Sequence, residues 1–326
     1  MKDKFLIGTA LNAWQITGRD TLGVALIKQH FNSIVAENCM KSETIQPEEG
    51  KFDFSLADRF VEFGQANGMH INGHTLVWHS QAPAWFFTDA NGKDVARDTL
   101  IERMRTHITT LVSRYKGKIK SWDVVNEAIL EDGSWRKSKF YEIIGEDFIA
   151  LAFRFAHEAD PAAELNYNDY SMALEAKREG VVNMIKSLQA QGVPIHGLGM
   201  QGHVDLDEPT LEAFEKSLTA FASLGLKVMI TELDISVLPA ELNPYPDGLP
   251  EEQAKALDHR YLDFFRLFLK HQDKIQRVTL WGVCDADSWR NNWPVPGRTD
   301  YALLFDRRHQ AKAVVGEIIK LATSVQ

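Results

Sequence analysis

The amino-acid sequence predicts an α/β protein that forms a single (β/α)8 TIM barrel over residues 1–326. Short apolar, β-rich runs alternate along the whole chain with longer stretches whose apolar residues recur at helical spacing. No change in composition marks a linker, and 326 residues are enough for one large barrel. Eight strands that alternate with eight helices indicate a closed parallel barrel. A doubly wound sheet would need fewer repeats and a topological switch point, which the sequence does not show.

The strands are predicted from short apolar runs that are typical of segments buried on both faces. In chain order they are residues 5–11, 33–39, 70–78, 121–128, 164–168, 197–204, 227–236 and 276–283. The runs at 121–128 and 227–236 also carry polar residues toward their ends, which sets them apart from strands that serve only packing.

The helices are predicted from apolar residues at i, i+3 and i+4 spacing. In chain order they are residues 21–30, 55–67, 99–115, 140–160, 175–191, 210–224, 251–271 and 310–325. Leu56, Phe60 and Phe63 form one such apolar face. Pro161 and Gly192 provide stops for the fourth and fifth of these helices.

Three long connections follow the third, seventh and eighth strands, at residues 80–98, 237–250 and 285–309. All three connect a strand to the next helix, so they belong to the C-terminal face of the barrel. Barrels of this type carry their active sites on that face.

The charge balance restricts the partners of the protein. The chain has 36 basic and 45 acidic residues, a net charge of −9, so nucleic acid and anionic membranes are not expected as partners. Apolar residues make up 44% and charged residues 25%, as in ordinary globular proteins. No apolar run reaches the roughly 18 residues of a membrane span. A neutral or weakly polar substrate is expected.

Two cysteines, Cys39 and Cys284, form neither a disulfide framework nor a metal cluster by their spacing. The first lies at the end of the second predicted strand, the second follows the eighth, and the first strand separates them. Strands lie ~4.8 Å apart, so these backbones should be nearly twice that distance from each other, beyond the ~4.4–6.8 Å of a disulfide. We predict two free thiols.

Two predicted strands end in carboxylates. Asn126 and Glu127 end the fourth strand, and Glu232 lies in the seventh. Burying a carboxylate is costly without partners, so a purely structural reason would require an ion pair with a neighbouring Lys or Arg. Because both strands end on the same barrel face, we expect a paired-carboxylate site. Retaining glycosidases need such a pair, with carboxyl groups about 5–5.5 Å apart.

Other motifs are less specific. Gly197-Leu-Gly-Met-Gln-Gly202 matches a dinucleotide fingerprint, but it lies within a predicted strand and no helix follows, so no cofactor is expected. His74, His79 and His203 lack the spacing of a metal site. His203 is expected to hydrogen-bond Glu232 and hold it ionised. His74 and His79 could either pack in the core or contact a sugar, and the sequence leaves both open. Trp281 and Trp289, near the eighth strand, could likewise either pack in the core or stack on a sugar ring.

Six segments match a known family in its own order. They are Glu37-Asn-Cys-Met-Lys41, His74-Thr-Leu-Val-Trp-His-Ser-Gln81, Trp122-Asp-Val-Val-Asn-Glu-Ala128, Gly199-Met-Gln-Gly-His203, Ile230-Thr-Glu-Leu-Asp-Ile235, and Leu280-Trp-Gly-Val283 with Ser288-Trp289. The sequence therefore resembles glycoside hydrolase family 10, whose members are mainly endo-β-1,4-xylanases, over essentially the whole chain. The family often has Trp where Phe140 stands, which we interpret as a packing change.

The resemblance implies a retaining mechanism with Glu127 as acid/base and Glu232 as nucleophile. It further implies that Asn126 bonds the sugar 2-hydroxyl and that His203 and Asp234 orient the nucleophile. The implied substrate-binding side chains are Glu37, Asn38, Lys41, His74, Trp78, His79, Gln81, Tyr170, Gln201, Trp281 and Trp289. No cofactor and no metal are needed for this reaction.

Xylan and xylo-oligosaccharides are the expected substrates, and a monomer is expected. A (β/α)8 β-1,4-glucanase and an inactive glycan-binding protein are the alternatives. The motifs at 37–41 and 74–81 argue against the first, and the complete set of catalytic and supporting residues argues against the second. The N-terminus lacks a signal peptide. We expect action outside the cytoplasm with the leader absent from this sequence, or cytoplasmic action on imported oligosaccharides.

Overall fold

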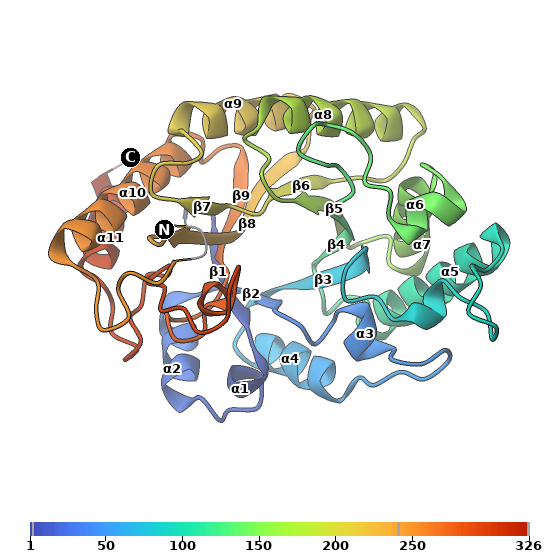
Figure 1. The fold of residues 1–326 in the computed structure, drawn as a ribbon, viewed down its shortest axis with the longest axis horizontal. Helices are drawn as coiled ribbons and strands as arrows, with labels where there is room; N and C mark the ends of the chain where they lie inside the picture. The colour runs from blue at the N-terminus through green and yellow to red at the C-terminus, as the bar shows by residue number, and fades with distance from the viewer. Residues whose placement is uncertain (2, 240–241, 325–326) are drawn as a thin grey trace.

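The alternation of strand and helix patterns produces a ring of parallel strands with helices around it (Figure 1). The computed structural model describes residues 1, 3–239 and 242–324. The strands are β1 (Leu6–Leu11), β2 (Ser33–Ala36), β3 (His70–Trp78), β4 (Ser121–Asn126), β5 (Glu164–Asp169), β6 (Gly197–Met200), β7 (His203–Asp205), β8 (Lys227–Ser236) and β9 (Ile275–Leu280). Each pairs with its neighbour in parallel from β1 to β6, and the ring closes through β8, β9 and β1. The predicted TIM barrel is confirmed.

The helices form the outer layer (Figure 1). The principal ones are α2 (Thr21–His30), α4 (Ser55–Ala66), α5 (Arg97–Arg114), α6 (Lys139–Ile144), α7 (Phe148–Ala159), α8 (Glu175–Ala190), α9 (Leu211–Ala222), α10 (Glu251–Lys270) and α11 (Ala313–Ser324). Short turns lie in the loops: α1 (Ala13–Ile16), α3 (Ser42–Ile45), η1 (Ala84–Phe86) and η2 (Trp289–Asn291). Val325 of the last predicted helix and residues 240–241 of the seventh loop lie outside the described residues.

The apolar helix faces pack against the sheet to form the core. Phe60 of α4 is completely buried, and Leu56 and Phe63 pack against the same core, as the spacing predicts. Phe153 of α7 and Phe264 of α10 are buried in the same way. A fully buried Phe side chain contributes about 1.5–3 kcal/mol, so this layer holds the strand ends, and the residues on them, in fixed positions.

The single strand predicted at 197–204 is wrong, because the segment forms two strands. Gly202 has a φ of +83°, and Gln201 before it leaves the ladder, so β6 ends at Met200. The second piece, β7, then pairs further along β8, with His203 opposite Asp234. The break turns the backbone where Gln201 and His203 both reach the C-terminal face.

The single helix predicted at 140–160 is also wrong. Gly145, with a φ of +93°, ends α6 in a conformation that favours glycine, and α7 begins at Phe148.

The second strand ends at Ala36, before Cys39. Both Cys39 and Cys284 are nevertheless free thiols, as predicted, and both are buried. In the described part of the chain, no helix combines the length and apolar character that a bilayer crossing requires.

Candidate active site

The two predicted carboxylates meet in one cavity of about 760 Å³ on the C-terminal face. β8 continues to Ser236, so Glu232 lies within this strand and not at the strand end that the sequence predicts. Glu127 follows β4 directly, and Glu232 lies on β8. Both side chains are largely buried, with 13% of the Glu127 side chain and 6% of the Glu232 side chain exposed. Such burial requires polar partners for each carboxylate.

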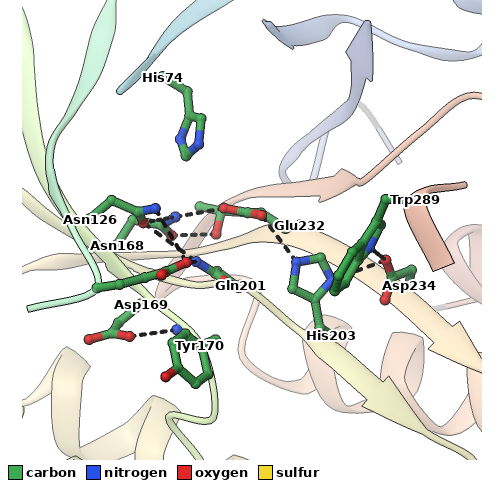
Figure 2. A network of polar contacts seen from close by, with 12 residues as sticks. His74, Asn126, Asn168, Asp169, Tyr170, Gln201, His203, Glu232, Asp234 and Trp289 are labelled. Atoms are coloured by element: carbon green, nitrogen blue, oxygen red, sulfur yellow. Dashed lines mark hydrogen bonds and ion pairs between the residues drawn. The ribbon is translucent and has the colours of Figure 1, made fainter. Parts of the chain in front are cut away.

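Glu232 lies between an amide and an imidazole (Figure 2). Its Oε1 accepts a hydrogen bond of 2.8 Å from Asn168 Nδ2, and its Oε2 lies 3.1 Å from His203 Nε2. Asn168 fits beside β6 because the neighbouring residue is glycine: a Cβ on Gly199 would lie 2.4 Å from Asn168 Oδ1. Two partners on its two oxygens fix the orientation of this carboxylate.

A second carboxylate lies behind His203. Asp234 Oδ2 is 3.0 Å from His203 Nδ1 and accepts a 2.7 Å hydrogen bond from Trp289 Nε1 (Figure 2). Arg290 Nε donates to the other oxygen, Oδ1, at 3.0 Å. His203 therefore links Glu232 to Asp234, as predicted, and Arg290 compensates the buried negative charge.

This arrangement favours the charged forms of both groups. Burial alone would lower the pKa of His203, but Asp234 and Glu232 outweigh it and raise that pKa to about 9. Burial likewise would raise the pKa of Asp234, but Arg290 and His203 hold it below its usual value. The raised pKa of His203 favours its imidazolium form, which lies between Asp234 and Glu232, and Glu232 faces the cavity.

Glu127 is held by different donors. Gln201 Nε2 donates to its Oε1 at 2.9 Å, and Trp78 Nε1 donates to its Oε2 at 2.8 Å. Its backbone has a φ of +60°, which is uncommon for a residue with a Cβ. Hydrogen bonds from Glu127 N to the carbonyl of Asn168 and from Arg136 Nε to the carbonyl of Glu127 keep it there. Such strained backbone is typical of functional positions.

Asn126 connects the two carboxyl groups. Its Oδ1 accepts from Asn168 Nδ2 at 3.0 Å and from Gln201 Nε2 at 3.4 Å. Since Asn168 also bonds Glu232 and Gln201 also bonds Glu127, the five side chains form one hydrogen-bonded unit. In the part of the chain that the structure describes, neither carboxylate pairs with Lys or Arg. The structural ion-pair alternative is therefore wrong.

A polar group lines the cavity beside α3. Lys41 Nζ donates to Asn38 Oδ1 at 2.9 Å and to Gln81 Oε1 at 2.8 Å, and it lies 4.9 Å from the ring centroid of Trp78. Burial lowers the pKa of Lys41, although Glu232 and Glu37 act in the opposite direction. Burial raises the pKa of Glu37, which the same Lys41 partly offsets. These groups could bind sugar hydroxyls from several directions.

Aromatic rings and a histidine form the wall of the cavity. His74 is buried with its Nδ1 2.9 Å from Asp123 Oδ2, and the edge of its ring meets Trp281 at a centroid distance of 5.4 Å. Trp289 stacks on Trp293, a residue that is 58% exposed. His74 thus lines the cavity instead of being only core packing, and Trp281 and Trp289 present ring surfaces to a ligand.

Tyr170, Arg136 and His79 also line the cavity. Arg136 Nη2 donates to the Tyr170 hydroxyl at 2.7 Å. His79 Nδ1 lies 3.9 Å from Glu127 Oε2. Burial lowers the pKa of His79, and Arg136 adds to this effect, so the neutral ring is favoured beside the carboxylate.

The structure brings all but one of the predicted site residues to this cavity, and Asp234 lies directly behind it. Sequence reasoning missed five contributors: Asn168, Arg136, Glu131, Arg290 and Trp293. Asn168 is the next-to-last residue of β5, and Asn126 is the last residue of β4, so a polar residue near a strand end was an available signal. The others lie in loops, where no pattern distinguishes them.

Comparisons with known proteins agree with this geometry. The family model described as glycosyl hydrolase family 10 matches residues 1–321. An endo-1,4-beta-xylanase A of Xylanibacter ruminicola is 53% identical, over 97% of this chain and 90% of that protein. An endo-1,4-beta-xylanase of Geobacillus stearothermophilus is 43% identical, over 97% and 96%. A solved GH10 endoxylanase from a sugarcane soil metagenome superposes with a TM-score of 0.96 at 49% identity, covering 98% and 97% of the two chains.

Proposed function

The chain belongs to glycosyl hydrolase family 10, and we infer that it is an endo-β-1,4-xylanase that retains the anomeric configuration. The roles of the two catalytic carboxylates rest on one observation. Glu127 and Glu232 reach one cavity from two strands, and Asn126, Asn168 and Gln201 join them into one hydrogen-bonded unit. A fixed pair of carboxyl groups is what double displacement at a glycosidic bond needs.

Glu232 is the nucleophile in this proposal. Asn168 and His203 both donate hydrogen bonds to it, one to each oxygen, which fixes the direction in which the carboxylate faces the sugar. It attacks the anomeric carbon and forms an ester, while Glu127 gives its proton to the leaving glycosidic oxygen. The negative charge of Glu232 is lost in that step, and the charge of Glu127 appears.

Glu127 then acts as the base. As a carboxylate it accepts hydrogen bonds from Gln201 and Trp78, so the charge formed in the first step meets donors that are already in place. It takes a proton from the water that attacks the ester, which releases the sugar with its original configuration. Asn126, between the two groups, is placed to bond the 2-hydroxyl of the sugar.

The cavity walls are proposed to bind the xylose units. Lys41, Asn38 and Gln81 form a connected polar group that suits the hydroxyls of a sugar on the non-reducing side. Tyr170, held by Arg136, suits a ring on the leaving-group side. Gln81 and Trp289 are proposed to occupy the space that the hydroxymethyl group of glucose would need, which favours xylan over cellulose.

We also propose that the protein is a monomer that acts outside the cytoplasm. All residues of the site come from one chain, so no second copy is needed to complete it. Xylan is a polymer, and its internal bonds are most accessible outside the cell. Light scattering after size exclusion tests the first proposal, and xylanase assays on fractionated cells test the second.

Product stereochemistry tests the proposed mechanism. In proton NMR spectra of early hydrolysis, new reducing ends should be β-anomers that later mutarotate. Early α-anomers would exclude double displacement. Glu232→Ala should abolish hydrolysis of xylan, and equal rates on xylan and cellulose by the unmodified protein would favour the glucanase alternative.

A further inference from the structure

A cluster of metal-ligating side chains lies outside the active site, where the start and the end of the chain meet. Cys284 Sγ is 3.4 Å from Asp287 Oδ2 and 3.7 Å from His309 Nε2. All three donor atoms lie within 4.8 Å of one another. A second carboxylate, Asp20 Oδ1, lies 3.4 Å from the same nitrogen of His309. The reaction proposed above uses none of these groups.

We propose that Cys284, Asp287 and His309 bind a Zn²⁺ ion. With usual zinc–ligand bond lengths, a tetrahedral site has edges of about 3.6 Å between sulfur and nitrogen and about 3.5 Å between sulfur and oxygen. The distances of 3.7 Å and 3.4 Å from Cys284 match these edges. Thiolate and imidazole ligands favour zinc over calcium or magnesium, which prefer oxygen.

The surroundings of the cluster also suit a cation. Gln15 Nε2 donates to Asp287 Oδ2 at 3.0 Å and to Asp20 Oδ2 at 2.9 Å, so one amide orients both carboxylates. Among the described residues, the single ion pair that these two carboxylates form is that of Asp20 with His309. Two negative charges therefore face one imidazole, and a divalent cation would compensate the excess.

His309 is held where its ring reaches the cluster. Its φ is +62°, uncommon for a residue with a Cβ. Its backbone N–H donates to the carbonyl of Asp306, and Asp306 Oδ1 accepts from Gln310 N at 2.8 Å. This turn precedes α11, whereas Cys284 follows β9 and Asp20 caps α2. A bound ion would tie the segments after β9 and before α11 together beside the first helices.

Binding requires the thiolate, so Zn²⁺ bonds to Cys284 Sγ as the thiol proton leaves to solvent. Zinc that binds only the folded chain raises its stability. The purified protein, after chelator treatment and dialysis, should bind one Zn²⁺ per chain by isothermal titration calorimetry. The measured heat should vary with the ionisation enthalpy of the buffer, because the buffer takes up the released proton. The Tm of the protein should rise by several degrees. Cobalt(II) in place of zinc should give tetrahedral d–d bands and a thiolate-to-cobalt charge-transfer band.

Three variants make the test specific. Cys284→Ser should lose the charge-transfer band, whereas Cys39→Ser, which removes the other buried thiol, should keep it. His309→Asn removes the imidazole but suits the left-handed backbone, so it should fold and lose the Tm response to zinc. Failure of the unmodified protein to bind zinc would overturn the proposal, because the cluster would then be a hydrogen-bonded network only. Unchanged zinc binding in both Cys284→Ser and His309→Asn would place the ion elsewhere and overturn it equally.

Discussion

The charge of His203 predicts how stability depends on pH. This ring lies between Asp234 and Glu232, and its pKa of about 9 exceeds the unfolded value of about 6.5. Below pH 6.5 the ring is protonated in both states, so its full contribution to stability is present. As the pH rises from about 6.5 to about 9, the unfolded chain loses the proton first and the contribution disappears. The difference between the folded and unfolded pKa values of His203 corresponds to about 3 kcal/mol of unfolding free energy.

Asp234→Asn should remove most of this effect, because Asp234 is the larger of the two carboxylate contributions to the raised pKa. Burial then dominates, and the pKa of His203 should fall toward or below 6.5. The variant should therefore lose less stability than the unmodified protein between pH 6.5 and pH 9.5. Its absolute stability will also fall, since Arg290 loses the nearer of its two carboxylate partners and keeps Asp205. The pH dependence, and not the absolute value, is therefore the measure.

Two experiments check this. NMR titration of histidine labelled with ¹⁵N, with His203→Gln to assign the signal, gives the pKa directly. Urea unfolding at a series of pH values gives the stability profile. Glu317→Gln serves as the control, because Glu317 is exposed and pairs with Lys320 on the surface, so the profile should not change. A His203 signal that titrates near 6.5 in the unmodified protein, or identical profiles for it and Asp234→Asn, would refute the assignment.

Three further predictions follow from the site and its supports. Glu127→Ala should lower activity on xylan by roughly 10²–10⁴-fold, while a nitrophenyl xylobioside, whose leaving group needs little protonation, should still give a burst that azide accelerates. Equal loss on both substrates without azide rescue would mean that Glu127 is not the acid/base. Activity on xylan should be higher than activity on cellulose by roughly 10–200-fold for each sugar site that excludes the hydroxymethyl group. Gln81→Ala should reduce this ratio, because the change opens space for that group. An unchanged ratio would count against a role of Gln81 in excluding it. Lys177 is completely buried, with its Nζ 2.8 Å from Asp169 Oδ1 and 3.6 Å from the Tyr170 ring centroid. Lys177→Met should therefore lower the free energy of unfolding in urea by about 3–5 kcal/mol, because it leaves Asp169 buried without its partner. Lys320→Met on the surface should lower it by about 1 kcal/mol or less. Similarly small losses of unfolding free energy in the two variants would show that the buried ion pair of Lys177 and Asp169 contributes little to stability.

The sequence could identify the two carboxylates because burial makes them costly. Glu127 and Glu232 stand at the ends of apolar runs, where packing alone gives no reason for a charge. The barrel follows from the same runs, since its strands and helices alternate with distinct periods. The residues that line the cavity around His74 and Lys41 could be predicted as well, because their motifs resemble those of a known family and the resemblance implied their roles.

The remaining features depend on tertiary contacts that no local pattern carries. Asn168 bridges Asn126 and Glu232 only because Gly199 on the next strand leaves room for it. The break of the sixth strand depends on Gly202 adopting a positive φ, and glycine occurs in intact strands as well. Gly145 divides a stretch whose apolar spacing continues on both sides, so periodicity alone predicts one helix.

The covalent intermediate tests the central claim most directly. An activated 2-deoxy-2-fluoro xylobioside slows the release step, so the glycosyl-enzyme should accumulate on the folded protein. Proteolysis and mass spectrometry of the labelled chain then identify the residue that carries the sugar. We predict one label per chain, on Glu232, which persists in Glu127→Ala and is absent from Glu232→Ala. A label on Glu127, or turnover without any covalent adduct, would contradict the proposed roles of the two carboxylates.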